Sequence, residues 1–426
     1  MLERTDDEFI KSTITENLLS RNKKLIYCVD FLLNQTNNSV ISINGKWGSG
    51  KTVFAKQIEY VMKHEEEYKQ LCSSYRVDEN ANYNSNEVFY YNSWENDSIN
   101  MPVHSLLLQL IKYYNVKSDT PLDLKKASKK VLNIMTKLAT NGAVDIEDLN
   151  LNKTEDEKIN ALLNDVICTE DLKEFFNNII DQILAEKNNR LLIIVDELDR
   201  CRPTYAIEML ECIKHFYSND KITFLVVTDN IQLSKTIKKV YGSEYDGELY
   251  LNRFYDSVIE LSNNINTFKT AYISSLYGKD ITETDLFNEI TMTCINYFKL
   301  ELRQINSFIE YAKTAQNIIG DYYNNSLLFK QSLAYCICCI SYGLKVTSVN
   351  EYDLYMQGKW NKLDEVLNSN VKLIEWLEEF IDIKSNDSFV SVLKQTYDAV
   401  FNGNSEIYTY DNFAKRLVLQ ILELQF

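Results

Sequence analysis

The sequence predicts an α/β fold, a doubly wound parallel P-loop sheet with helices on both faces, followed by an all-helical carboxyl-terminal domain. Three observations support this prediction. A β-branched apolar run at 40–44 precedes a glycine-rich loop and an amphipathic stretch at 53–61, in the order strand, loop, helix. A second apolar run, 191–195, ends in two acidic residues. From residue 264 onwards, apolar residues recur at helical spacing.

The glycine-rich loop has the spacing of a phosphate-binding loop, in which backbone N–H groups surround a polyphosphate. Glycines allow the necessary bends, and the following helix offers the positive end of its dipole. The residues expected to bind nucleotide are Gly45, Lys46, Trp47, Gly48, Ser49, Gly50, Lys51, Thr52 and Val53. Lys51 would place an ammonium between the β- and γ-phosphates, and the Thr52 hydroxyl would ligate Mg²⁺. A chance glycine turn before a helix is the alternative.

Two acidic residues end the apolar run 191–195, as carboxylates do at the carboxyl end of a central parallel strand. We expect Asp196 to bind the Mg²⁺ ion. Glu197 would then orient or deprotonate an attacking water. The alternative is that Glu197 only caps the helix that follows.

Four segments together match a known family: 45–52, 92–95, 196–203 and 250–256. Through them the chain resembles the KAP family of P-loop NTPases over about residues 15–310. The string Asp-Glu-Leu-Asp-Arg-Cys-x-Pro is the most discriminating part. Many animal members carry transmembrane helices within this domain, and this chain has no such segment.

The resemblance implies Mg-dependent ATP hydrolysis that drives closure between the core and a helical domain, with formation of a homo-oligomer. It also implies the strand order 5-1-4-3-2 and, from bacterial relatives, a role in defence against phage. The toxic step would come from the carboxyl-terminal domain or from a separate effector protein. The five strands are expected at 40–44, 88–91, 191–195, 222–227 and 258–261.

The chain is expected to divide into a P-loop core at 1–262 and a helical lid or regulatory domain at 263–426. Within the core, one helix is expected over 8–36. The polar range 106–187 reads as a helical insertion for a partner or for self-association.

The second domain is expected to contain helices at 298–314 and 327–344. Its candidate core residues nearer the carboxyl end are Trp360, Trp376, Leu377 and Phe380.

Polar residues at other strand ends could complete the site. Thr228 and Asp229 end the fourth strand, where one could sense the γ-phosphate or merely cap the next helix. Asn92 ends the second strand, and its amide could hold the attacking water or a metal-bound water. Trp94 is expected to pack in the core rather than touch nucleotide.

Several arginines are candidates to stabilise the charge of the phosphoryl transition state. Arg253 follows the fourth strand, and Arg303 begins a helix of the second domain, similar to the lid arginine of related ATPases. Arg200 and Arg202 directly follow the acidic pair. For each of them, a surface salt bridge is the alternative.

Composition favours a cytoplasmic enzyme. No run approaches the roughly 18 to 20 apolar residues that cross a bilayer, and residues 1–8 are too acidic for a signal peptide. Nine irregularly spaced cysteines and three histidines predict reduced, buried thiols rather than a zinc site. The lack of an Asn-Lys-x-Asp string after the fourth strand favours ATP over GTP.

Two other functions stay open. The protein could be a nucleotide switch that does not turn over until a trigger, such as a phage product, binds it. It could also be a motor stimulated by nucleic acid. The net charge of −16 opposes nonspecific nucleic-acid binding. A short basic ridge, more typical of a solvated helix face, is formed by Lys125, Lys126, Lys129 and Lys130.

Overall fold

The computed structural model of the chain divides into two compact units, Met1–Asn263 and Asn264–Phe426. The residues that the structure describes are 6–80, 83, 86–98, 102–117, 176–184, 190–215, 219–261, 285–319, 325–379, 388–402 and 418–422. Among them, no helix is long and apolar enough to span a membrane.

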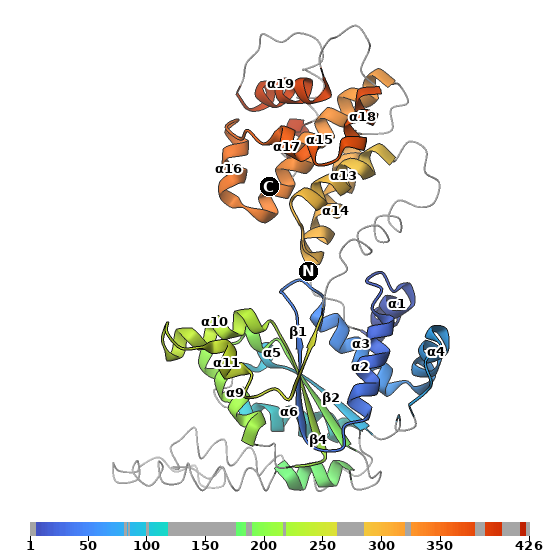
Figure 1. Cartoon of the computed structure of the whole chain (residues 1–426), viewed down its shortest axis with the longest axis vertical. Coiled ribbons are helices and arrows are strands. Elements are labelled where there is room, and N and C mark those ends of the chain that lie inside the picture. The colour runs from blue at the N-terminus through green and yellow to red at the C-terminus, as the bar shows by residue number, and fades with distance from the viewer. Residues whose placement is uncertain are drawn as a thin grey trace. The chain divides into compact units, whose positions relative to one another are not determined.

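A five-stranded parallel sheet forms the centre of the first unit (Figure 1). Its strands are β1 (Ser39–Asn44), β2 (Asn86–Asn92), β3 (Arg190–Asp196), β4 (Ile222–Thr228) and β5 (Ser257–Glu260). Their order across the sheet is β2-β3-β4-β1-β5, which is 5-1-4-3-2 read from the opposite edge. The register pairs Asn92 with Asp196 and Asn44 with Thr228, so the polar strand ends meet at one edge.

One face of the sheet is covered by the amino-terminal helices. They are α1 (Asp7–Glu16), α2 (Asn22–Leu33), α3 (Lys51–Lys63) and α4 (Glu65–Tyr75). Because successive strand residues point to opposite faces, Ile41, Ile43 and Ile194 pack with these helices in one hydrophobic cluster. This layer holds the helix that follows the glycine-rich loop.

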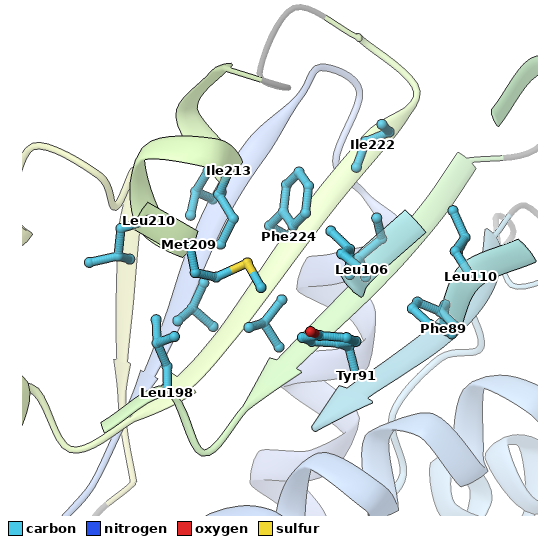
Figure 2. Close-up of a cluster of buried hydrophobic side chains, with 14 of the residues drawn as sticks. Phe89, Tyr91, Leu106, Leu110, Leu198, Met209, Leu210, Ile213, Ile222 and Phe224 are labelled. Atoms are coloured by element: carbon cyan, nitrogen blue, oxygen red, sulfur yellow. The ribbon is translucent and has the colours of Figure 1, made fainter. Parts of the chain in front are cut away.

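The opposite face carries a second hydrophobic cluster, so the sheet is doubly wound as expected. The helices over it are α6 (Pro102–Lys117), α9 (Pro203–His215), α10 (Asn230–Tyr241) and residues 176–184. Figure 2 shows Met209 of α9 over Phe224 of β4, and Leu106 of α6 toward Tyr91 of β2. The fold therefore buries the apolar strands on both sides and leaves their polar carboxyl ends at one edge.

The expected single helix over 8–36 is wrong, because the structure has α1 and α2 there instead. Asn17 ends α1 with a left-handed backbone of φ 46°. Its Oδ1 atom accepts hydrogen bonds from the backbone N–H groups of Arg21 (2.9 Å) and Asn22 (3.2 Å). Asparagine tolerates this conformation better than most residues, so it turns the chain between the two helices.

Both ends of the range 106–187, expected to be an insertion, pack in the second cluster. Leu106, Leu107 and Leu110 do so from α6, and Phe176 and Ile180 from the other end. These ends therefore belong to the core of the first unit. The middle of the range, 118–175, lies outside the described residues and includes the basic ridge of four lysines.

The described elements of the second unit are helical. They are α13 (Asp285–Tyr297), α14 (Leu302–Ile319), α15 (Asn325–Thr347), α16 (Val349–Met356), α17 (Leu363–Asn368), α18 (Val371–Glu379), α19 (Phe389–Phe401) and residues 418–422. The expected helix at 327–344 lies within α15, which contacts α13, α14, α16 and α19. The expected helix at 298–314 starts too early, because Lys299, with φ of 51°, is not helical and α14 begins only at Leu302.

The predicted core residues of this unit differ in how far they are buried. Trp360 and Leu377 are buried, Trp376 is half-buried, and Phe380 lies outside the described residues. The described cysteines are free thiols, and all of them except the half-buried Cys212 are buried.

Candidate nucleotide-binding site

The glycine-rich loop joins β1 to α3 at the carboxyl edge of the sheet. Gly48 and Gly50 have φ values of 78° and 80°, in the left-handed region that favours glycine. A Cβ atom on Gly45 would lie 2.7 Å from the Ser49 hydroxyl oxygen. The loop thus needs glycine at these three positions to keep its backbone course.

Lys51 is the first residue of α3 and is buried beneath the loop. Its ammonium donates to the carbonyl oxygens of Gly45 (2.8 Å) and Lys46 (3.3 Å). Both acceptors belong to the loop itself. The Lys51 ammonium therefore lies within the loop that the sequence predicts to bind phosphate.

Asp229 links this loop to the end of β4. Its Oδ2 accepts the backbone N–H of Trp47 at 3.0 Å, and its Oδ1 caps α10 by accepting from Ile231 (3.1 Å) and Gln232 (3.2 Å). Thr228 accepts the Gly45 N–H through its carbonyl oxygen at 3.2 Å. The carboxylate expected either to sense phosphate or to cap a helix is thus a cap that also contacts the loop.

Asp196 ends β3 fully buried. It accepts from the Tyr90 hydroxyl (2.7 Å) and from the Glu197 N–H (2.8 Å), and the Thr52 side chain lies beside it. Burial raises the pKa of Asp196, while these hydrogen bonds oppose that rise. The arrangement brings together Thr52 and Asp196, the two expected metal ligands. A hydroxyl beside a carboxylate is a donor set that suits Mg²⁺, which prefers hard oxygen ligands.

Glu197 follows in a left-handed conformation, with φ of 59°, and is buried. Its Oε1 atom lies 3.0 Å from Nη2 of Arg200. It precedes the short 3₁₀ helix η2 (Leu198–Arg200), but its side chain makes no capping hydrogen bond there. The geometry therefore gives no support to the alternative in which Glu197 only caps the next helix.

The comparisons with known proteins bear on this loop and acidic pair. Residues 20–369 match the model of the KAP family P-loop domain. The chain belongs to the KAP family. No curated protein matches it. Among solved structures, a chain of Drosophila ORC bound to GC-rich DNA and Cdc6 is 11% identical, with 98% of this chain and 72% of that chain covered and a TM-score of 0.30.

Two exposed tryptophans flank η2 in this KAP domain. Asp199 accepts a hydrogen bond from the indole N–H of Trp47, and the Arg200 guanidinium lies 5.6 Å from the centre of the Trp94 ring. Trp94 is 52% exposed, so the expectation that it packs in the core is wrong. Its place on the short helix α5 (Ser93–Asn96), beyond the end of β2, puts the ring over a charged side chain instead.

Asn92 pairs with Asp196 in the register of the sheet. Its Oδ1 atom accepts from the N–H groups of Trp94 (3.1 Å) and Glu95 (3.3 Å), which makes it the cap of α5. The strand end is where the sequence places it. The side-chain oxygen of Asn92, however, accepts hydrogen bonds from the first N–H groups of α5.

The candidate arginines of the KAP domain lie in different surroundings. Arg200 contacts Glu197, whereas Arg202 forms an ion pair of 3.8 Å with Asp97. Arg253 is exposed, two residues beyond the end of α11 (Gly247–Leu251). Arg303 is exposed at the second position of α14 in the second unit. Of these four, Arg200 is joined directly to the acidic pair.

Two residues that contact the site were not predicted from the sequence. Tyr90 reaches Asp196 because β2 and β3 pair, and the expected strand order would have allowed this contact to be found. Arg21 reaches the loop from the start of α2, where it donates to the Ser49 carbonyl oxygen at 2.9 Å. No motif marks Arg21, which lies 28 residues before its acceptor.

Proposed function

We propose that this KAP protein binds Mg-ATP at residues 45–53 and hydrolyses it to ADP and phosphate. The observation that carries the proposal is the position of the buried Asp196 carboxylate at the end of β3, beside the Thr52 side chain of the loop, with Glu197 as the next residue. Two candidate metal ligands, Thr52 and Asp196, and a candidate base, Glu197, thus lie beside the phosphate-binding loop.

Binding would depend on the loop and on Lys51. The backbone N–H groups of the loop would face the phosphates, and the positive end of α3 would favour their negative charge. The Lys51 ammonium now donates to two loop carbonyls, and phosphate oxygens are stronger acceptors for it. Lys51 would therefore donate to the nucleotide when it binds.

Thr52 and Asp196 are the residues that would hold Mg²⁺, which when bound would neutralise charge on the phosphates. Glu197 would accept a proton from the attacking water or orient it. Asn92 and Asp229 flank the acidic pair on the neighbouring strands and would fix the positions of α5 and of the loop. Arg253 or Arg303 would stabilise the charge of the transition state.

The resemblance to bacterial KAP proteins supports a wider role in antiviral defence. In this proposal the protein is cytoplasmic, assembles as a homo-oligomer with ATP, and responds to a phage-derived trigger. The toxic step would come from the carboxyl-terminal domain or from a separate effector protein.

A nucleotide switch without basal turnover is the second candidate. The ion pair between Glu197 and Arg200 favours it, because a carboxylate held by a guanidinium is not directed at an attacking water. Such a protein would hold ATP until a trigger separates the pair.

The test of the proposal is phosphate release from Mg-ATP at several protein concentrations. The variants are Lys51→Ala and Glu197→Gln, with Glu248→Gln on the exposed surface of α11 as a matched control. The proposal requires turnover per subunit that rises with concentration, that both site variants abolish and that the control retains. Turnover that survives in Lys51→Ala would overturn it, and bound ATP without turnover would favour the switch.

A further inference from the structure

Arg21 is a buried cation whose side chain reaches the phosphate-binding loop. Its residue surface is 6% exposed, and its Nη1 atom donates to the Ser49 carbonyl oxygen at 2.9 Å. Arginine is among the residues that are rarely buried, so this placement needs a reason. Burial lowers the pKa of Arg21 to about 10, which leaves the guanidinium charged at neutral pH.

The junction between α1 and α2 fixes where Arg21 points. Asn17 ends α1 and accepts the Arg21 N–H at 2.9 Å, while the Asn22 side chain donates to the Ile14 carbonyl oxygen at 2.8 Å. Asn17 also donates to the Tyr75 hydroxyl of α4 at 2.7 Å. Arg21 therefore extends from a turn that is anchored on both sides.

The contact acts on one particular peptide of the loop. The carbonyl of Ser49 and the N–H of Gly50 belong to the same planar, trans peptide, so they point in opposite directions. When Arg21 holds the Ser49 carbonyl, the Gly50 N–H is turned away from Arg21. Gly50 is also the residue that precedes α3, with φ of 80°, so its peptide sets the start of the helix that carries Lys51.

We propose that Arg21 is a positioning residue for nucleotide binding, one that fixes the Ser49–Gly50 peptide of the loop and adds a positive charge beside it. The inference rests on the proposed nucleotide function. It also makes the α1–α2 turn part of the binding site, because a shift of that turn would move the loop.

The variant Arg21→Met tests this, because it keeps a long side chain in the buried position and removes both the charge and the donor. Arg21→Lys keeps the charge with a different donor. Tyr68→Phe is the matched control, since it breaks a contact between the buried Tyr68 of α4 and Asp30 of α2 without touching the α1–α2 turn or the loop. Two quantities are measured: amide hydrogen exchange of peptides covering 45–54 without nucleotide, and the Kd for Mg-ATP by calorimetry.

The expected result is faster exchange of the loop and a Kd about tenfold higher in Arg21→Met, partial recovery in Arg21→Lys, and wild-type values in Tyr68→Phe. Equal effects in Tyr68→Phe would overturn the inference, because general loosening of the amino-terminal helices would then explain them. Unchanged loop exchange in Arg21→Met would overturn it as well. If the wild-type protein binds no Mg-ATP, the nucleotide function fails, whereas the exchange comparison still decides whether Arg21 positions the loop.

Discussion

Glu197 and Arg200 are joined by an ion pair of 3.0 Å between Oε1 and Nη2. The carboxylate is buried, and the guanidinium is the more exposed partner and also lies over the Trp94 ring. Because one turn of chain holds both charges, Arg200 fixes the direction of the Glu197 side chain. The pair thus connects the candidate base with an exposed aromatic surface.

For a protein that hydrolyses ATP without a trigger, Arg200→Ala is expected to lower kcat by about tenfold with little change in the KM for Mg-ATP, because Arg200 acts through Glu197 and not on the phosphates. A raised kcat would instead favour the switch, in which this pair holds Glu197 back. Steady-state kinetics measures both constants. Arg202→Ala is the control, since Arg202 pairs with Asp97 instead. Equal losses in the two variants, or a change confined to KM, would contradict this role.

Asp229→Ala is expected to destabilise the protein by about 1 kcal/mol through loss of the α10 cap, and to weaken Mg-ATP binding severalfold because Trp47 loses its acceptor. Asp246→Ala removes an equivalent cap, that of α11, away from the loop. Thermal unfolding and calorimetry should show similar stability losses in the two variants but weaker binding only in the first. Weaker binding in both would count against a link from Asp229 to the loop.

Tyr90→Phe should raise the Mg²⁺ concentration for half-maximal turnover by about tenfold, because Asp196 loses the hydroxyl that orients it. At saturating Mg²⁺ we expect little loss of rate. Tyr91→Phe is a neighbouring control, since that hydroxyl contacts Ser105 and Tyr205 on the other face of β2. An unaltered Mg²⁺ dependence in Tyr90→Phe would show that its hydroxyl does not support the metal site.

The strands were predictable because their chemistry is local. β3 and β4 are buried on both faces, so β3 appears in the sequence as a continuous apolar run and β4 as one interrupted only by Thr223. The loop and acidic pair were found because phosphate and Mg²⁺ require those residue types at those spacings. The approach of Thr52 to Asp196 then follows from adding the sheet order.

The predictions that were wrong concern places where the backbone conformation of one residue decides the structure. Asn17 divides the expected long helix through a left-handed conformation that helical periodicity does not reveal. Trp94 was expected in the core because tryptophan is apolar, although the cap at Asn92 starts a helix that leaves its ring exposed. The contact of Arg21 with Ser49 depends on the α1–α2 turn, so no local pattern could predict it.

The buried His104 is expected to make the protein less stable in mild acid. It is buried in α6, and burial lowers its pKa to about 4. The unfolded chain takes up the proton near the ordinary pKa of about 6.5, so unfolding becomes easier as the pH falls below that value. Between pH 7.5 and pH 5 this costs about 2 kcal/mol.

His104→Leu should remove that part of the pH dependence, which chemical denaturation at the two pH values measures. A variant that loses as much stability as the wild type between pH 7.5 and pH 5 would show that His104 is not responsible.

The most direct test of nucleotide binding at this loop is calorimetric titration of the wild type, Lys51→Ala and Lys46→Ala with Mg-ATP. Lys51 is buried within the loop, whereas the Lys46 side chain is exposed, so Lys46 would contribute to the site through its backbone alone. The predicted result is a Kd raised about a hundredfold in Lys51→Ala, roughly 3 kcal/mol, and one within about threefold of the wild type in Lys46→Ala. Equal affinity of the wild type and Lys51→Ala for Mg-ATP would contradict the assignment of the loop as the nucleotide site.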